Sequence, residues 1–129
     1  MESFIGWIGG KRMLRKAILE RFPTDEVGRY VEVFGGAAWV LFAKEKKANQ
    51  LEVYNDINSN LVNLFRCVKY HCGELQREME RMLTSREQFF DCLAQGQGRG
   101  LTDIQRAARF FYTVKISFGC DNRTYATSS

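Results

Sequence analysis

The stretch RYVEVFGGAAWVLF, from Arg29 to Phe42, decides the fold. Its first part, Arg29 to Phe34, is mostly β-branched and aromatic, which is typical of a strand. The strand pattern stops at Gly35-Gly36, and the residues from Ala37 to about Lys47 resume a helical pattern with a basic end. The stretch therefore predicts a strand, a glycine turn and a helix in direct succession.

The flanking segments extend this unit. Apolar residues at helical spacing predict a helix from Lys11 to about Phe22, ended by Pro23. The sequence LEVYN, Leu51 to Asn55, predicts a second short strand, and a helix is expected from Asn58 to about Tyr70. A β-α-β-α unit with short connections indicates a parallel, doubly wound α/β sheet.

The second half of the chain is predicted to be helical. A charged segment with a helical pattern runs from Glu74 to Gln95. The sequence GQGRG, from Gly96 to Gly100, is expected to end it as a flexible loop. Either Thr102 or Asp103 is expected to cap a further helix that continues to about Ser117. The residues after Phe118 show no hydrophobic period.

Composition limits the classes of protein. With 129 residues, of which 45% are hydrophobic, the chain is expected to form one domain. Its net charge of +4 suits a polyanion-facing surface without demanding one. No apolar run reaches the roughly 20 residues of a membrane span, so we expect a cytoplasmic protein without membrane contact, whose four cysteines are reduced.

A metal site is not expected. Cys67 and His71 would share a helix face with Cys72 next in sequence, but a closed zinc site needs a fourth ligand. Helix packing is the favoured interpretation of these residues.

The glycine turn is the expected ligand site, because open parallel sheets bind cofactors beyond the carboxyl ends of their strands. Gly35 and Gly36 are adjacent and do not form the G-x-G-x-x-G pattern that a pyrophosphate needs. Asp56 stands twenty positions after Gly36, where an acidic residue can accept hydrogen bonds from a ribose. A nucleoside cofactor without phosphates, S-adenosylmethionine, fits both features.

Plainer interpretations stay open for the same residues. Asp56 could instead cap the helix that begins near Asn58, and Gly35-Gly36 could be a simple strand-to-helix turn. The indole of Trp7 and the ammonium of Lys11 suit a cofactor pocket, but on the residues alone a core aromatic and a solvated helix start are the favoured interpretations.

Four ordered blocks carry a resemblance to a known family. They are WIGGK (residues 7–11), YVEVFGGAAWVLF (30–42), YNDIN (54–58) and RAARFFYTVKISFG (106–119). Together they resemble the N-terminal part of a Dam-type (D12 class) adenine-specific DNA methyltransferase. The resemblance implies an incomplete Rossmann-like S-adenosylmethionine-dependent methyltransferase core with a helical insert. Residues of about 1–70 would form the cofactor-binding unit, and about 71–129 a helical segment leading into target recognition.

The resemblance also implies roles for single residues. Trp7 and Lys11 match the family's first motif, which contributes to the cofactor pocket. Phe34, Gly35 and Gly36 match the glycine motif, and Asp56 matches the ribose-binding acid. For Lys11, both the methionine tail of the cofactor and a catalytic acid remain possible partners.

The implied reaction transfers a methyl group from S-adenosylmethionine to N6 of an adenine flipped out of double-stranded DNA. Phosphate contacts would come from basic side chains in the second half of the chain. The candidates are Arg99, Arg106, Arg109, Lys115 and Arg123, and for each of them an ordinary surface charge is the plainer interpretation.

One departure from the family is decisive for catalysis. The family's catalytic motif is D-P-P-Y, and this sequence contains a single proline, Pro23. We therefore expect no catalytic residues in this chain and interpret it as a fragment or the first part of a split gene. A catalytically inactive module that binds S-adenosylmethionine or DNA is the alternative, and a dinucleotide-dependent oxidoreductase domain is a second rival.

Overall fold

The computed structural model describes residues 2–96, 98–117 and 120–126, which form two compact units. The first unit comprises residues 2–4 and 9–57, and the second comprises residues 5–8 and 58–126. The helix after Asn58, which the sequence analysis groups with the strands, thus belongs to the second unit. No helix in the described part of the chain is long and apolar enough to cross a membrane.

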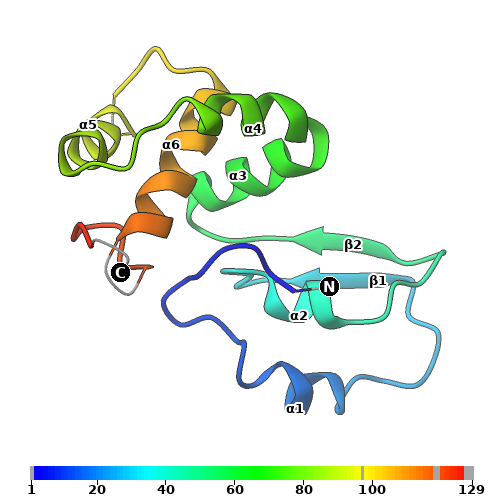
Figure 1. Ribbon diagram of the computed structural model, residues 1–129. Helices are drawn as coiled ribbons and strands as arrows, with labels where there is room; N and C mark the ends of the chain where they lie inside the picture. Colours follow the sequence, from blue (N-terminus) through cyan, green and yellow to red (C-terminus); the bar gives the residue numbers. More distant parts are fainter. Residues whose placement is uncertain (1, 97, 118–119, 127–129) are drawn as a thin grey trace. The chain divides into compact units, whose positions relative to one another are not determined.

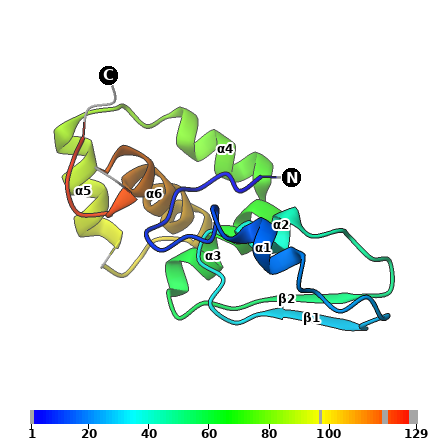
Figure 2. The ribbon, with the colours of Figure 1, turned by 90° about the horizontal axis from the view of Figure 1, so that it is seen from below.

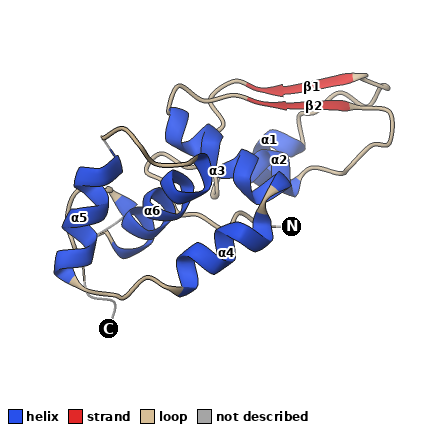
Figure 3. Cartoon of the chain, turned by 90° about the horizontal axis from the view of Figure 1, so that it is seen from above, coloured by secondary structure: helices blue, strands red, loops and turns tan. Residues whose placement is uncertain are grey.

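The first unit contains a parallel pair of strands. Strand β1 (Arg29–Glu32) pairs with β2 (Leu51–Tyr54), with Val31 opposite Val53 (Figure 1). Helices α1 (Arg15–Leu19) and α2 (Trp39–Ala43) contact each other on one side of this pair (Figure 3). The predicted parallel pairing is confirmed. Within the described ranges the sheet has only these two strands, so the Rossmann-like core stays a prediction.

Helix α1 is shorter than predicted. Residues 11–14 form a turn, in which the Leu14 amide donates to the Lys11 carbonyl at 3.1 Å, and no side chain caps the helix. Met13, one of the apolar residues at helical spacing in this segment, is 90% exposed. The prediction of a helix from Lys11 to Phe22 is therefore wrong in its length, and none of the residues of α1 is buried.

Helix α2 also stops early, at Ala43 rather than near Lys47. Lys44 is extended, and its buried side chain forms an ion pair with Glu52 of β2. The same ammonium donates to Gln50 Oε1 at 2.8 Å and lies 5.2 Å from the Tyr30 ring centre. These tertiary contacts fix the connection between α2 and β2.

The second unit is a helical cluster. It contains α3 (Ser59–Tyr70), α4 (Cys72–Glu80), α5 (Arg86–Gly96) and α6 (Asp103–Ile116). Helix α6 packs against the other three (Figures 1 and 2).

Side chains at the helix ends explain where these helices begin. Asn58 caps α3, and Thr102 caps α6 by accepting from the Gln105 amide at 3.2 Å. The predicted helical stretch from Glu74 to Gln95 is divided into α4 and α5, because Ser85 Oγ accepts from the Gln88 amide at 3.0 Å and starts a new helix.

The N-terminal segment of the second unit is tightly packed. Ile5 is buried, and a Cβ added to Gly6 would lie 2.5 Å from the Cys120 sulfur. After α6, Ser117 forms an isolated bridge with Tyr125, so the aperiodic tail folds back on the end of the helix. Residues 118, 119 and 127–129 of that tail lie outside the described residues.

Tyr112 connects α6 to the break between α4 and α5. Its ring belongs to a buried cluster with Phe89 and Cys92. Its hydroxyl donates to the Leu83 carbonyl at 2.7 Å and accepts from the Ser85 amide at 3.3 Å. Both groups lie in the connection between the helices and would lose their partner without the hydroxyl.

We expect the Tyr112→Phe substitution to lower the free energy of unfolding by about 1 to 2 kcal/mol, because it leaves those backbone groups without a partner. Urea unfolding followed by circular dichroism measures this change. Tyr70→Phe is the matched control, since Tyr70 is 65% exposed, and should change stability by less than about 0.5 kcal/mol. Equal stabilities of the two variants would contradict the assigned role of Tyr112.

Candidate functional site

The glycine turn is bonded to the residues that follow β2. The Gly35 amide donates to the Asn55 carbonyl at 2.9 Å, and the Asn55 amide donates to the Glu32 carbonyl at 2.9 Å. The Asn55 side chain also donates to the Val33 carbonyl at 3.0 Å. The two strand ends are thereby held together at the edge where the sequence places the ligand site.

Each glycine of the turn is required for a different reason. A Cβ on Gly35 would lie 2.2 Å from the Tyr54 ring, far inside any permitted contact. Gly36 adopts a φ of 50°, in the left-handed region that side chains rarely enter. The Tyr54 hydroxyl donates to the Gly36 carbonyl at 2.7 Å, and burial raises the pKa of Tyr54, which keeps this donor protonated.

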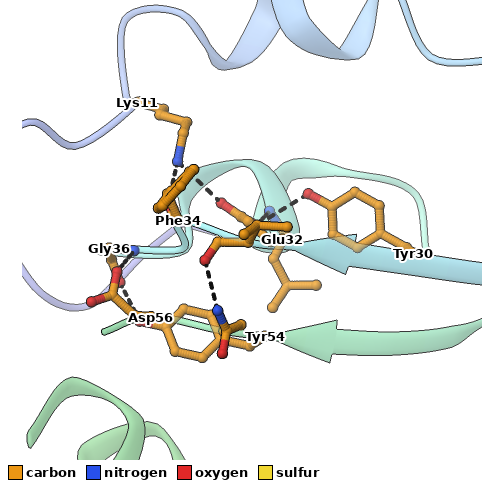
Figure 4. A network of polar contacts seen from close by, with 10 residues as sticks. Lys11, Tyr30, Glu32, Phe34, Gly36, Tyr54 and Asp56 are labelled. Atoms are coloured by element: carbon orange, nitrogen blue, oxygen red, sulfur yellow. Dashed lines mark hydrogen bonds and ion pairs between the residues drawn. The ribbon is translucent and has the colours of Figure 1, made fainter. Parts of the chain in front are cut away.

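Asp56 binds the glycine turn directly. Its Oδ2 accepts a hydrogen bond from the Gly36 amide at 2.9 Å, across twenty positions of sequence (Figure 4). The cap of α3 is Asn58, whose Oδ1 accepts from the Asn60 and Leu61 amides. The interpretation of Asp56 as that helix cap is therefore wrong, while its role toward a ribose stays a prediction.

Lys11 reaches the same turn from the other side. Its ammonium donates to the Phe34 carbonyl and lies 3.9 Å from Glu32 Oε1 (Figure 4). The sequence left two possible partners for Lys11, the methionine tail of a cofactor and a catalytic acid. The structure shows a different partner, the carboxylate of Glu32. Lys11 is therefore not a solvated helix start.

Glu32 also contacts the residues around the turn, and no sequence motif singled it out. It is only 6% exposed, and its Oε2 accepts from the Tyr30 hydroxyl at 3.1 Å and the Leu41 amide at 2.9 Å. Its Oε1 is buried and has no hydrogen-bond partner among the described residues. The available signal was a carboxylate between two valines of a strand, immediately before the glycine turn.

Burial raises the pKa of Glu32. The hydrogen bonds from Tyr30 and Leu41 and the positive charge of Lys11 act in the opposite direction without overcoming the loss of hydration. Ionisation of this carboxyl group therefore costs free energy of hydration, which its hydrogen bonds and the Lys11 charge offset only in part.

The structure thus brings five of the six predicted site residues together in the first unit. They are Lys11, Phe34, Gly35, Gly36 and Asp56. Phe34 leaves 79% of its surface exposed beside them. Trp7 belongs to the second unit, where its ring lies 5.8 Å from that of Phe110.

The cysteine and histidine residues do not converge. Cys67 is buried in α3, whereas Cys72 is exposed at the start of α4. In the part of the chain that the structure describes, no group of three His, Cys, Asp or Glu side chains is arranged to hold a metal ion.

A parallel strand pair, a glycine turn at its carboxyl end and an acid bonded to that turn are features typical of α/β proteins that bind ligands beyond the carboxyl ends of their strands. Residues 7–125 match the family model of the D12 class N6 adenine-specific DNA methyltransferases. The chain belongs to this family, and the resemblance seen in its four sequence blocks is confirmed.

Two curated proteins illustrate the relationship. The chain is 30% identical over 128 residues to the Type II methyltransferase M1.LlaDCHI of Lactococcus lactis subsp. cremoris, a match covering 92% of this chain and 42% of that protein. It is 24% identical over 123 residues to the Type II methyltransferase M.MjaIII of Methanocaldococcus jannaschii, covering 92% and 38%. The chain therefore spans about two fifths of the length of these relatives.

We expect Gly35→Ala to destabilise the chain by about 1 to 3 kcal/mol, because the new methyl group overlaps the Tyr54 ring. Urea unfolding monitored by tyrosine and tryptophan fluorescence gives the free energies. Gly28→Ala is the control, since a Cβ there meets nothing within 4 Å. If both substitutions have the same small effect, the contact with Tyr54 does not constrain the turn.

Stability should depend on pH through Glu32. The folded chain holds this proton to a higher pH than the unfolded chain, whose glutamate pKa is 4.5. The resulting stabilisation is complete below about pH 4.5 and is lost as pH rises through the raised pKa. The free energy of unfolding of the natural chain, minus that of Glu32→Gln, should therefore fall as pH rises above about 4.5. Urea titrations at several pH values measure it, and a constant or rising difference would refute the prediction.

Proposed function

We propose that this chain binds S-adenosylmethionine at its glycine turn, as the cofactor-binding part of a site-specific DNA adenine-N6 methyltransferase. The observation that carries the proposal is the hydrogen bond from the Gly36 amide to Asp56. It joins the turn and the acid, the two halves of a phosphate-free nucleoside site, in one compact unit.

The residues around the turn suit this cofactor better than a dinucleotide. Two carboxylates, Glu32 and Asp56, border the turn, and they would repel a pyrophosphate. S-adenosylmethionine carries no phosphate and has a positive sulfonium centre, from which the reaction takes its methyl group. The local charge therefore favours S-adenosylmethionine over NAD.

Each residue has a distinct proposed task. A carboxylate offers about four lone-pair positions, so Asp56 can hold the Gly36 amide and accept from ribose hydroxyls with the same group. The exposed ring of Phe34 offers an apolar surface to the cofactor. Lys11 fixes the turn through the Phe34 carbonyl, and its charge is available to the carboxylate of the methionine tail.

The proposed methyl acceptor is an adenine taken out of the DNA duplex. Phosphate contacts are proposed for five basic residues of the second unit: Arg99, Arg106, Arg109, Lys115 and Arg123. Arg99, Lys115 and Arg123 are exposed, whereas Arg109 donates to Gln95 Oε1 at 2.6 Å. Because the sequence has no D-P-P-Y, we propose that this chain by itself transfers no methyl group.

The ribose role of Asp56 can be tested with a pair of ligands. Asp56→Ala should weaken binding of S-adenosylhomocysteine by about 1.5 to 3 kcal/mol in calorimetry. In the natural chain, the 2′-deoxy analogue of that ligand should bind more weakly than the parent compound. In the variant the two should bind alike, because the partner of the missing hydroxyl is gone.

The comparison separates ribose binding from support of the turn. If Asp56 only holds Gly36, the substitution weakens both ligands equally, and the ribose role is excluded. Tighter binding of NAD than of S-adenosylhomocysteine by the natural chain would overturn the choice of cofactor.

A further inference from the structure

Two arginines stack on the ring of Trp39, the first residue of α2. The guanidinium carbon of Arg12 lies 5.4 Å from the centre of this ring, and that of Arg15 lies 5.2 Å from it. Arg15 also forms an ion pair with Glu2 at 3.0 Å. One half-buried indole therefore joins the start of α2 to the turn of residues 11–14 and to the first residue of α1.

The turn and α1 have little apolar attachment of their own. None of the residues of α1 is buried, and no side chain caps the helix. Met13 and Leu14, the apolar residues of the turn, are exposed. Contacts between a guanidinium and an aromatic face remain favourable at partly exposed positions, and indole is the most effective ring for them. The stack on Trp39 is therefore a main attachment of this segment to α2.

The position of Lys11 depends on the same segment. Lys11 begins the turn, directly before Arg12, and its side chain extends to the Phe34 carbonyl and to Glu32 Oε1, 3.9 Å from the ammonium (Figure 4). Because the lysine stem is flexible, its ammonium stays at these groups only while the backbone of the turn is held nearby. We infer that Trp39 is a positioning residue of the candidate site. By stacking on the two arginines, it holds Lys11 against the glycine turn and Glu32.

The residue types of this contact are specific. A guanidinium is planar and stacks on an aromatic face, whereas an ammonium is a compact, strongly hydrated charge. The ring is also attached to the glycine turn, because Trp39 follows Ala38, whose amide donates to the Gly35 carbonyl at 2.8 Å. The stack thus connects Lys11 to the turn by a second route, through α2, in addition to the direct contact at Phe34.

Within the proposed function, this position matters because the Lys11 charge is assigned to the methionine tail of the cofactor. Ligand binding therefore tests Trp39 only if that proposal holds. The titration of Glu32 needs no ligand and tests Trp39 independently.

The pKa of Glu32 reports the position of Lys11. Burial raises this pKa, and the positive charge of Lys11 lowers it. The Tyr30 hydroxyl, the Leu41 amide and the Tyr54 phenol also interact with the carboxyl group, and none of these residues is substituted in the experiment. A shift of the pKa that depends on Lys11 therefore measures how closely its ammonium is held to Glu32.

Carbon-13 NMR of the glutamate-labelled chain follows this titration, with Glu32→Gln used to identify the signal. In Trp39→Leu, Glu32 should titrate at a higher pH than in the natural chain, because Lys11 is no longer held beside it. Lys11→Gln should shift the titration in the same direction, because it removes the charge altogether.

Three further variants separate this contact from a general change of the helix. Trp39→Phe keeps a weaker ring for the arginines and should give an intermediate titration. Arg12→Lys combined with Arg15→Lys keeps both charges but removes the stacking, so it should shift Glu32 as Trp39→Leu does. Phe90→Leu removes a guanidinium–ring contact of 5.5 Å in the second unit and is the matched control, with no shift expected.

The Lys11→Gln background decides whether Trp39 acts through Lys11. In this background, Trp39→Leu should cause no further change in the titration of Glu32. In calorimetry, Trp39→Leu should raise the dissociation constant of S-adenosylhomocysteine roughly twofold to fivefold in the natural background and leave it unchanged in Lys11→Gln.

The positioning role is refuted if Lys11→Gln shifts the titration of Glu32 but Trp39→Leu and the double arginine variant do not, or if Lys11→Gln itself causes no shift. It is also refuted if Trp39→Leu has the same effect with and without Lys11, since the ring would then act through α2 alone. If Trp39→Leu does not fold, the double arginine variant decides. If the natural chain does not bind S-adenosylhomocysteine, the proposed cofactor is wrong, and the titration still decides the role of Trp39.

Discussion

The hydrogen bond between the Gly36 amide and the Asp56 carboxylate closes the first unit at the end where its ligand site is proposed. Strand pairing ends at Glu32 and Tyr54, and backbone bonds through Asn55 extend the contact as far as Gly35. The bond to Asp56 joins the next residue of the turn, Gly36, to the segment after β2. The Tyr54 hydroxyl donates to the Gly36 carbonyl, so both backbone polar groups of this glycine are hydrogen-bonded.

A buried charge network supports the same turn. Glu32 links the Leu41 amide of α2, the Tyr30 hydroxyl of β1 and the Lys11 ammonium within one carboxyl group. Such a group stabilises little by itself, because the loss of hydration offsets most of the attraction. Its contribution is geometric, since it specifies where α2 and the turn at Lys11 lie relative to the strands of this unit.

Local signals explain which parts of the structure were predictable. The parallel pairing followed from short strands separated by a helix, and the start of α6 followed from the capping chemistry of Thr102. The lengths of α1 and α2 could not be predicted from local signals. Lys11 and Lys44 form ion pairs with Glu32 and Glu52, which lie 21 and 8 positions further along the chain. In the candidate site, glycine spacing identified the turn and Asp56. No local pattern shows that Glu32 is buried, or that Trp7 packs on Phe110 in the other unit.

The short segment of residues 5–8 makes the two units inseparable as pieces of sequence. The backbone passes from one unit to the other after Phe4, after Ile8 and after Ile57. A cut after Ile57 would therefore leave the second unit incomplete, because Ile5, Gly6 and Trp7 would remain on the peptide of the first unit. An insertion or deletion between Phe4 and Gly9 would alter the second unit, to which these residues belong. It would also change the connection between the two segments of the first unit.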